Sequence, residues 1–513
     1  MEEPFLQGEH GVSTSVRLAV ETISSDLQVA QMTLTATHIP GRRELSTERA
    51  GLSLIVVAYL IAVLLPLQLS LGGTILSSVR IVVVLAVIPL AVGLIRGRYG
   101  PLLPTDWLFF AHTVWMGVSI GVMTPSMAVS QFGSVGSEFL GGYLIGRALI
   151  RTPDQFRKLL LVVGSMIMLL IPVTLFEMLT GQAILIDLLK KVPLFSTVGH
   201  ATTEARLGLN RAQVVFSHPI HWGLFASSLF SLLLIGLQGS VPLSKRLALA
   251  GAAALGTYSS LSSGALLPLI LQIVLIGWAF ATRSLQRRWW ILIALVVCAW
   301  TMIELLSDRS AMMAVLTRLA FSSHNVYWRS IIFDWGWMNI FGSSENGIPS
   351  ARLFGLGLNE WVRPIYMSSS SIDNFWLLIG VRHGIPGFLA VAGGFVLLIW
   401  KVARRDFGDD IQLNHMRLAW VITFVSLGLS LGTVHIWGSI YSYTFFLLGA
   451  GAWLSSIEPN SIGSNKGDEG KYSAPQARQP SYTRFGQAGD MSDWGSPQRT
   501  YARLTPALAT RRP

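Results

Sequence analysis

Twelve apolar segments, most of them close to the length that crosses a bilayer, constrain this chain more than any other feature. An α-helix needs about 20 apolar residues to span the hydrocarbon core. Of the 513 residues, 51% are hydrophobic and only 13% are charged, whereas about a quarter are charged in soluble domains. The sequence therefore predicts an all-α polytopic membrane protein. The predicted transmembrane helices are 50–68, 79–95, 106–123, 131–150, 158–177, 218–237, 244–261, 264–281, 289–305, 374–400, 416–434 and 437–456.

Basic residues are distributed unevenly between the loops on the two sides of the membrane. If the N-terminus is cytoplasmic, the loops on its side carry arginine or lysine, as at Arg96 and Arg98 or at Arg404 and Arg405. The short loop 69–78 on the other side carries none. Because Lys and Arg accumulate in cytoplasmic loops, we predict that both termini are cytoplasmic. The net charge of +11 is explained by this bias, and we predict no nucleic-acid partner.

The fourth span, 131–150, has the weakest apolar signal because it contains Glu138, Arg147 and many glycines. Without this span, basic and neutral loops would no longer alternate between the two sides of the membrane. We therefore predict that 131–150 spans the membrane. Charged residues inside a span usually face a bundle interior or a cavity. Arg147 is therefore a functional candidate, with the alternative that it snorkels toward the surface near Arg151.

The two ends of the chain differ in composition from the transmembrane domain at 50–456. Residues 1–49 are polar and lack an early apolar stretch, so they predict a disordered cytoplasmic segment rather than a signal peptide. Residues 457–513 are rich in Ser, Gly, Pro, Gln and Arg, which predicts a disordered cytoplasmic tail.

Two long segments, 178–217 and 306–373, are predicted on the outer, periplasmic side of the membrane, the second directly before the tenth span. The second segment is rich in Trp, Phe and Tyr, which indicates a folded or membrane-lying lid rather than a linker. Within it, 326–341 has the period of an amphipathic helix.

The two outer segments contain several arginines, although basic residues usually accumulate on the cytoplasmic side. A guanidinium group binds phosphate through two parallel hydrogen bonds and stays charged when partly desolvated. A cluster of them near the bilayer surface suits the phosphate of a lipid carrier. Alternatively, individual arginines pair with nearby carboxylates such as Asp334, Glu360 and Asp373. The candidates are Arg206, Arg211, Arg309, Arg318, Arg329, Arg352 and Arg363.

Polar residues also mark the tenth span. Asp373 and Asn374 stand at its outer end, where they could cap the helix or place a carboxylate that takes a proton from an acceptor hydroxyl. Arg382 and His383 lie two to three turns further on. The Gly-Ile-Pro-Gly sequence at 384–387 predicts a kink whose freed backbone groups neighbouring segments satisfy.

We predict no metal site and no cofactor. His218 and His221 are spaced three residues apart across a proline, but packing or hydrogen bonding explains this pair better than metal binding. The single cysteine, Cys298, excludes an intramolecular disulfide.

The order of these features resembles the O-antigen ligase and O-antigen polymerase superfamily of bacterial membrane glycosyltransferases. The stretch RAQVVFSHPIHWGLF at 211–225 is similar to the Arg–Phe–Pro segment of that family. Residues 327–361 resemble its Arg–Trp helix and the glycine turn after it, and residues 373–391 resemble its His-Asn–Leu–Gly-x-x-Gly signature. The resemblance covers about residues 200–400.

This resemblance implies a metal-independent glycosyltransferase of the bacterial inner membrane with its active site facing the periplasm. It would transfer glycan from an undecaprenyl-diphosphate-linked oligosaccharide to an acceptor sugar hydroxyl, in assembly of exopolysaccharide, capsule or O-antigen. By this carry-over Arg211 and Arg329 bind the diphosphate, and Asp373 and Asn374 are catalytic. Further candidates for substrate binding are Arg206, Arg352, Arg363 and His218.

One position departs from the family pattern, because Asp373 stands where members often have histidine. An aspartate can act as a base or orient the acceptor, but it cannot be a cationic phosphate contact. His383 is off the motif position and does not replace it. The departure favours a polymerase over a ligase that attaches glycan to lipid A-core.

Two other classes of protein fit a chain with twelve spans. A transporter or flippase for polysaccharide precursors usually shows broken helices in both halves, whereas here only the tenth span is clearly interrupted. A non-catalytic factor would instead work with envelope polysaccharide assembly proteins.

Overall fold

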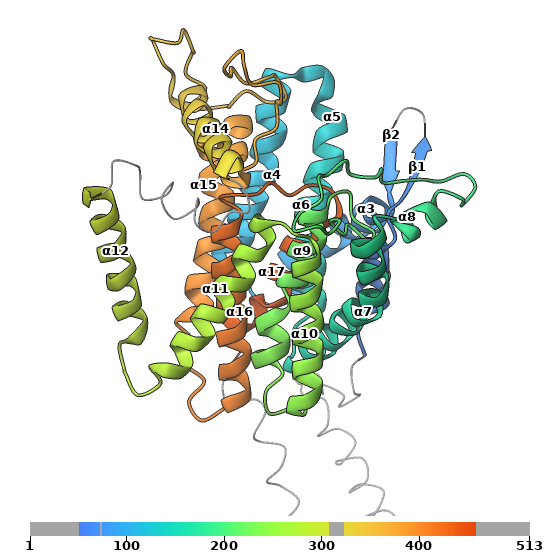
Figure 1. Cartoon of the computed structure of the whole chain (residues 1–513), viewed down its shortest axis with the longest axis vertical. Helices are drawn as coiled ribbons and strands as arrows, with labels where there is room; N and C mark the ends of the chain where they lie inside the picture. The colour runs from blue at the N-terminus through green and yellow to red at the C-terminus, as the bar shows by residue number, and fades with distance from the viewer. Residues whose placement is uncertain (1–50, 72–73, 307–322, 458–513) are drawn as a thin grey trace, which may run out of the picture. The chain divides into compact units, whose positions relative to one another are not determined.

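The computed structural model describes residues 51–71, 74–306 and 323–457 (Figure 1). Predictions for residues 1–49, for 458–513 and for Arg309 and Arg318 lie outside this part. The helices are α2 Leu54–Leu64, α3 Ser78–Ile95, α4 Pro104–Met123, α5 Ala128–Gln131, α6 Ser137–Leu149, α7 Pro153–Thr180, α8 Ile184–Leu189, α9 Pro219–Ser227, α10 Leu243–Ser259, α11 Ser263–Ala281, α12 Arg288–Leu306, α14 Ser323–Phe341, α15 Phe375–Ala403, α16 Ile411–Ser430 and α17 Ser439–Ala450.

Six helical segments in the described part are long and apolar enough to cross a membrane. They are α3, α7, α9 with the π-helical turn that follows it, α11, α12 and α15. The other predicted spans correspond to α2, α4, α6, α10, α16 and α17, which are shorter or less apolar. The chain is thus a mainly helical, multi-pass membrane protein by helix length and composition.

A small antiparallel sheet adds to the helices, so the all-α prediction was incomplete. Strands β1 (Leu67–Leu71), β2 (Thr74–Ser77) and β3 (Ser196–Thr197) pair in the order β2-β1-β3. The hairpin occupies the segment predicted as a bare loop at 69–78. Leu alternates with Gln or Ser along β1, which is the period of a strand. The prediction missed this strand because its first residues were included in the apolar span 50–68.

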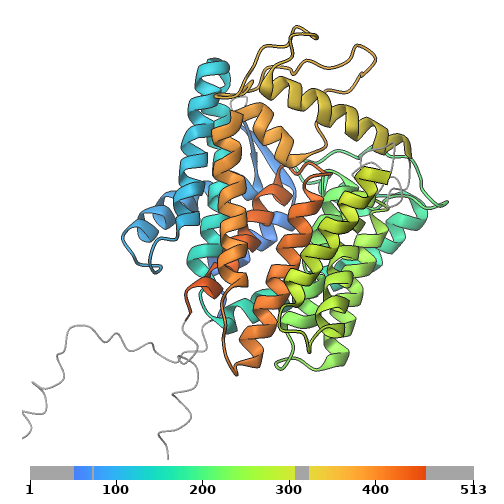
Figure 2. The same cartoon turned by 90° about the vertical axis from the view of Figure 1, so that its left-hand side faces the viewer.

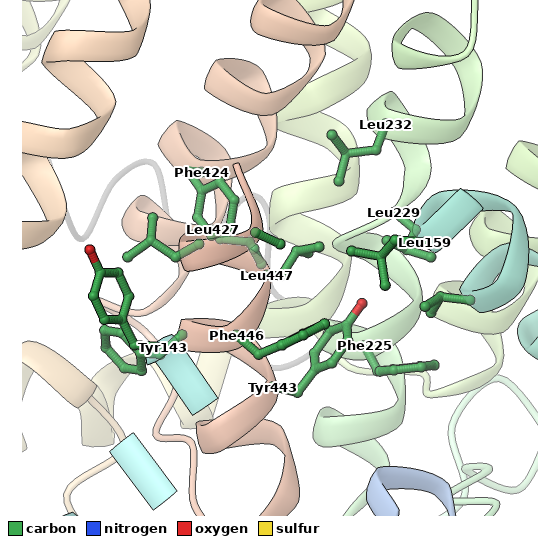
Figure 3. Packing of buried hydrophobic residues seen from close by; sticks show 14 of the residues in the cluster. Tyr143, Leu159, Phe225, Leu229, Leu232, Phe424, Leu427, Tyr443, Phe446 and Leu447 are labelled. Carbon is green, nitrogen blue, oxygen red and sulfur yellow. The ribbon is translucent and has the colours of Figure 1, made fainter. Parts of the chain in front are cut away.

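Close approach of the backbones of α6 and α17 explains two glycines of the fourth predicted span, Gly142 and Gly146. A Cβ atom added to Gly146 would overlap the carbonyl oxygen of Phe446 and lie 2.6 Å from the backbone nitrogen of Ala450. One added to Gly142 would overlap the carbonyl oxygen of Ser442. Two glycines four residues apart let the helices touch, as in membrane helix pairs with small residues at the interface. Tyr143, Tyr443 and Phe446 pack in this core (Figure 3).

Arg147 of α6 is buried in the bundle, so the alternative that it snorkels to the surface is wrong. Its Nε lies 3.4 Å from Oδ1 of Asp106 on α4, and its Nη2 donates to the carbonyl oxygen of Pro101 at 2.8 Å. Asp106, whose side chain is fully buried, also accepts hydrogen bonds from the Tyr143 hydroxyl and from the backbone N–H of Leu103. The pair therefore ties α4 to α6 through two buried side chains of opposite charge.

The predicted kink in the tenth span is present at Gly384, where φ is 69° and ψ is −174°. The glycine turn at 351–357 forms backbone hydrogen bonds to the residues on both sides of this break. The N–H of Leu356 donates to the carbonyl oxygen of Val381 at 2.8 Å, and the N–H of Gly357 donates to that of Arg382 at 2.9 Å. Backbone groups freed by the kink are thus satisfied by a neighbouring segment.

The two halves of α15 fold back on each other at Gly384, so that the Trp376 and Phe395 rings lie 5.4 Å apart between centroids. We call the end of the bundle near Asn374 the Asn374 end and the end near Ala403 the Ala403 end. Helix α14 runs across the Asn374 end (Figure 2). It packs on the first half of α15, where Gly336 meets Leu377 and Ile340 meets Gly380. The long segment before the tenth span therefore folds against the bundle in its described part.

Candidate functional site

The segment after α8 brings two arginines to the end of α10. Arg211 donates from Nε to the carbonyl oxygen of Ser260 at 3.1 Å, and Arg206 donates from Nη1 to that of Leu261 at 2.7 Å. Both carbonyls follow the last turn of α10, where the helix dipole favours positive charge. A guanidinium has five N–H donors, and the other donors of Arg211 have no partner among the described residues.

Glu177, near the end of α7, holds the backbone of this segment in place. Its two carboxylate oxygens accept the consecutive backbone N–H groups of Gln213 at 2.9 Å and Val214 at 3.0 Å. The N–H of Ala212 donates to the carbonyl oxygen of Ser259 at 3.0 Å. The arginines are therefore presented from a segment tied to two helix ends.

Arg329 comes to the same place from α14. Its Nη2 is 3.8 Å from the position of a Cβ on Gly264, in the first turn of α11. Burial lowers the pKa of the Arg329 guanidinium, the negative charge of Asp373 opposes this shift, and the positive charge of Arg206 adds to it. Two charges from other segments of the chain, Asp373 and Arg206, therefore lie close enough to act on Arg329.

His218 caps α9 and faces the same charges. Its Nδ1 accepts the backbone N–H of Ile220 at 3.1 Å. Burial and the positive charge of Arg211 together lower the pKa of His218 to about 4, although the charge of Asp373 opposes the shift. The imidazole is therefore neutral at pH 7, and because Nδ1 accepts, Nε2 carries the proton and can donate.

Asp373 and Asn374 have different roles at the start of α15. Oδ1 of Asn374 accepts the backbone N–H of Leu377 at 3.0 Å, so Asn374 is the N-cap that the sequence predicted. Asp373 does not cap the helix. Its carboxylate is exposed and accepts a hydrogen bond from the Ser371 hydroxyl at 2.8 Å, and its negative charge acts to raise the pKa of Arg329 and of His218.

We name the convergent side chains the basic cluster: Arg206, Arg211, His218, Arg329 and Asp373. Burial and the positive charge of Arg206 together lower the pKa of Arg211 to about 10, so the guanidinium stays charged at pH 7. Desolvated guanidinium groups that repel one another are stabilised by an anion placed between them. The arrangement can therefore bind a phosphate-like group beside an exposed carboxylate.

Arg352 and Arg363 do not join the basic cluster. Arg352 is exposed, donates to the carbonyl oxygen of Phe341 at 3.2 Å and lies over its ring. Arg363 pairs with Glu360 at 3.1 Å and donates to the carbonyl oxygen of Met367 at 3.3 Å. Pairing with a nearby carboxylate, the alternative to phosphate binding, therefore applies to Arg363.

The predicted spans 416–434 and 437–456 left only two residues between them. The longer loop between α16 and α17 was therefore not predicted from the sequence. It carries His435 and Trp437, and the Trp437 ring centroid lies 3.9 Å from that of His221. His218 also contacts Trp437, at 6.2 Å between ring centroids. The only local signal was the aromatic sequence His-Ile-Trp at 435–437. In the described part, no group of three or more His, Cys, Asp or Glu residues could hold a metal ion.

Comparison with known proteins does not identify a relative. No protein-family model matches the chain, and no curated protein sequence is significantly similar to it. The geometry of the basic cluster is therefore the basis for a functional assignment.

Proposed function

We propose that this protein is a glycosyltransferase that uses an undecaprenyl-diphosphate-linked oligosaccharide as donor and a sugar hydroxyl as acceptor. The reaction is most consistent with a polymerase in the assembly of exopolysaccharide, capsule or O-antigen. The observation that carries the proposal is that the charges of Arg206 and Arg211 meet in one place, with Arg329 beside Arg206 and beside the exposed carboxylate of Asp373.

Arg211 and Arg329 bind the diphosphate in this proposal. Negative charge grows on the diphosphate as its bond to the anomeric carbon breaks, and preorganised donors stabilise that charge most effectively. The backbone clamp at Glu177 supports such preorganisation, because it fixes the segment that carries Arg211. The Nε2–H of His218 adds a neutral donor beside the two guanidinium groups.

Asp373 acts as the general base. The acceptor hydroxyl transfers its proton to the carboxylate while its oxygen bonds to the anomeric carbon, and undecaprenyl diphosphate leaves with the electrons of the broken bond. Asn374 positions this carboxylate by fixing the first turn of α15. The role as a base is open to an aspartate and does not require the histidine that the family often has at this position.

The proposed orientation places the Asn374 end at the periplasmic face of a bacterial inner membrane. The loops at the Ala403 end contain Arg96, Arg98, Arg404 and Arg405, and basic loops favour the cytoplasm. The basic cluster would then lie near the headgroups of the outer leaflet, where a lipid-linked glycan presents its diphosphate. Envelope polysaccharide assembly proteins would be its partners.

The broken helix α15 is the observation that would favour a transporter. Transporters use such breaks to expose backbone groups to a substrate at mid-membrane. Here the groups at the break bind residues 351–357 instead, as when Ile385 donates to the carbonyl oxygen of Arg352 at 2.7 Å. The break therefore supports the anchoring of a loop better than it supports a transport site.

The decisive experiment deletes the gene and restores it with Arg211→Ala, Arg329→Ala or Arg363→Ala. We expect the first two variants to insert normally but to leave single lipid-linked repeat units, while Arg363→Ala restores polymer because Arg363 pairs with Glu360. Long polymer that is not attached to lipid A-core would identify a ligase instead. Full-length polymer from both cluster variants would exclude a diphosphate site there.

A further inference from the structure

Trp437 is held in an unusual setting beside the basic cluster. Its side chain is 43% exposed, yet three imidazole rings lie within 6.2 Å of it between centroids. The His221 ring meets it edge-on at 3.9 Å between centroids, and the His435 ring stacks on it at 5.5 Å with an interplanar angle of 30°. His218 is the third, at 6.2 Å. The indole is therefore fixed on one side and open on another.

The loop that carries Trp437 is tied to the start of α15. The backbone N–H of Phe375 donates to the carbonyl oxygens of Leu431 at 2.9 Å and Val434 at 3.1 Å. Phe375 directly follows Asp373 and Asn374. The same two hydrogen bonds therefore hold the loop close to the Asp373 carboxylate. His218 belongs to the basic cluster and also touches Trp437, which places the indole next to the proposed diphosphate site.

His435 supplies a polar group at the same place. Its Nδ1 is buried and has no hydrogen-bond partner among the described residues. Burial and the positive charge of Arg382 together lower the pKa of His435 to about 4, so the ring is neutral at pH 7. A neutral imidazole offers one donor and one acceptor, which is what a sugar hydroxyl requires.

An exposed tryptophan near a membrane surface can also be part of an interfacial aromatic belt. Trp107 and Trp290 are exposed to a similar degree, 59% and 64%, and have no ring contact with another described residue. Trp437 differs because its contacts fix the ring. A tryptophan that only lies at the membrane interface does not need a fixed ring orientation. A tryptophan that binds a ligand does, because a preorganised side chain gives higher affinity.

We propose that Trp437 is a stacking platform for a sugar ring of the donor glycan next to the diphosphate, and that His435 binds a hydroxyl of that sugar. The inference rests on the proposed function, because it assumes that the basic cluster holds the diphosphate. The C–H groups on the apolar face of a sugar stack on the electron-rich face of an indole, which is rigid and exposes a large contact area.

The test compares two ligands on the full-length protein in lipid nanodiscs. One is undecaprenyl diphosphate without sugar, and the other is the lipid-linked repeat unit extracted from cells that lack the gene. We expect Trp437→Ala to weaken binding of the glycan-bearing lipid about tenfold and to leave undecaprenyl diphosphate unaffected. Trp437→Phe keeps a ring and should retain most of the affinity, and Trp107→Ala should change neither ligand.

Each outcome separates this inference from the proposed function. If Trp437→Ala binds both ligands as the wild type does, or loses both equally, Trp437 is not a sugar platform. If Arg211→Ala retains full affinity for undecaprenyl diphosphate, the diphosphate site itself is wrong. A selective loss in Trp437→Ala, together with a loss of both ligands in Arg211→Ala, supports both proposals.

Discussion

Ile385 donates its backbone N–H to the carbonyl oxygen of Arg352 over 2.7 Å, across the break in α15. This bond and its neighbours hold the glycine turn at 351–357 against a membrane helix. They also place the start of α15, with Asp373 and Asn374, at a fixed distance from α14, which carries Arg329. The break is thus an anchoring point for the segment before the tenth span.

Gly384→Ala should destabilise the protein by at least about 2 kcal/mol, because its φ of 69° is a left-handed conformation and a Cβ would overlap the carbonyl oxygen of Leu353. Gly393→Ala on the same helix is the control, since its Cβ would only reach 3.8 Å from Leu108. Thermal unfolding in nanodiscs measures both. Equal stability of the two variants would show that the break is not held as described.

Gly146→Ala should cost more than about 2 kcal/mol, because the added methyl group overlaps the backbone of α17 at Phe446. Gly251→Ala on α10 is the matched control, because a Cβ there has nothing within 4 Å. It should be neutral or stabilising by up to about 1 kcal/mol, the difference in helix propensity. Unfolding in denaturant, compared at a fixed lipid composition, gives the two values.

Arg147→Met should destabilise the bundle by about 3–5 kcal/mol, because it leaves Asp106 charged and buried without its partner. The double variant Asp106→Asn, Arg147→Met should recover part of the loss, since no isolated charge remains. A double-mutant cycle on unfolding free energies measures the coupling between the two sites. Stable but inactive single variants would instead assign Arg147 a direct role in function.

Stability should fall as the pH is lowered from 6.5 toward 4, in part through His435, whose pKa is lowered to about 4 by burial. In the unfolded chain His435 binds a proton below pH 6.5, whereas in the folded protein it stays neutral until about pH 4. Its contribution is therefore complete above pH 6.5 and is lost on acidification. His435→Gln should reduce the slope of melting temperature against pH in that window, and an unchanged slope would contradict the assignment.

Asp373→Asn should abolish polymer formation while the lipid-linked donor still binds, because the amide cannot take a proton from the acceptor. Asp373→His would place a base of higher pKa at this position, so we expect partial activity with an optimum at higher pH. Polymer chain length in complemented cells and donor binding in nanodiscs provide the two readouts. Wild-type polymer from Asp373→Asn would remove the carboxylate from the mechanism.

Several local features could be predicted from sequence because they depend on neighbours along the chain. Asn374 caps α15 through Leu377, three residues away. The kink at Gly384 and helix α14 were likewise signalled by glycine, proline and aromatic residues at fixed spacing. The β1–β2 hairpin was missed, since four to five alternating residues give too weak a signal beside a long apolar run.

The sequence by itself determined that this chain is a mainly helical membrane protein, because the length and hydropathy of a span are local properties. The tertiary structure decided which polar residues meet. It joined Arg147 to Asp106 and fixed Trp437 against His221. Those contacts arise from packing of helices that are distant in the chain, and no periodicity along one segment encodes them.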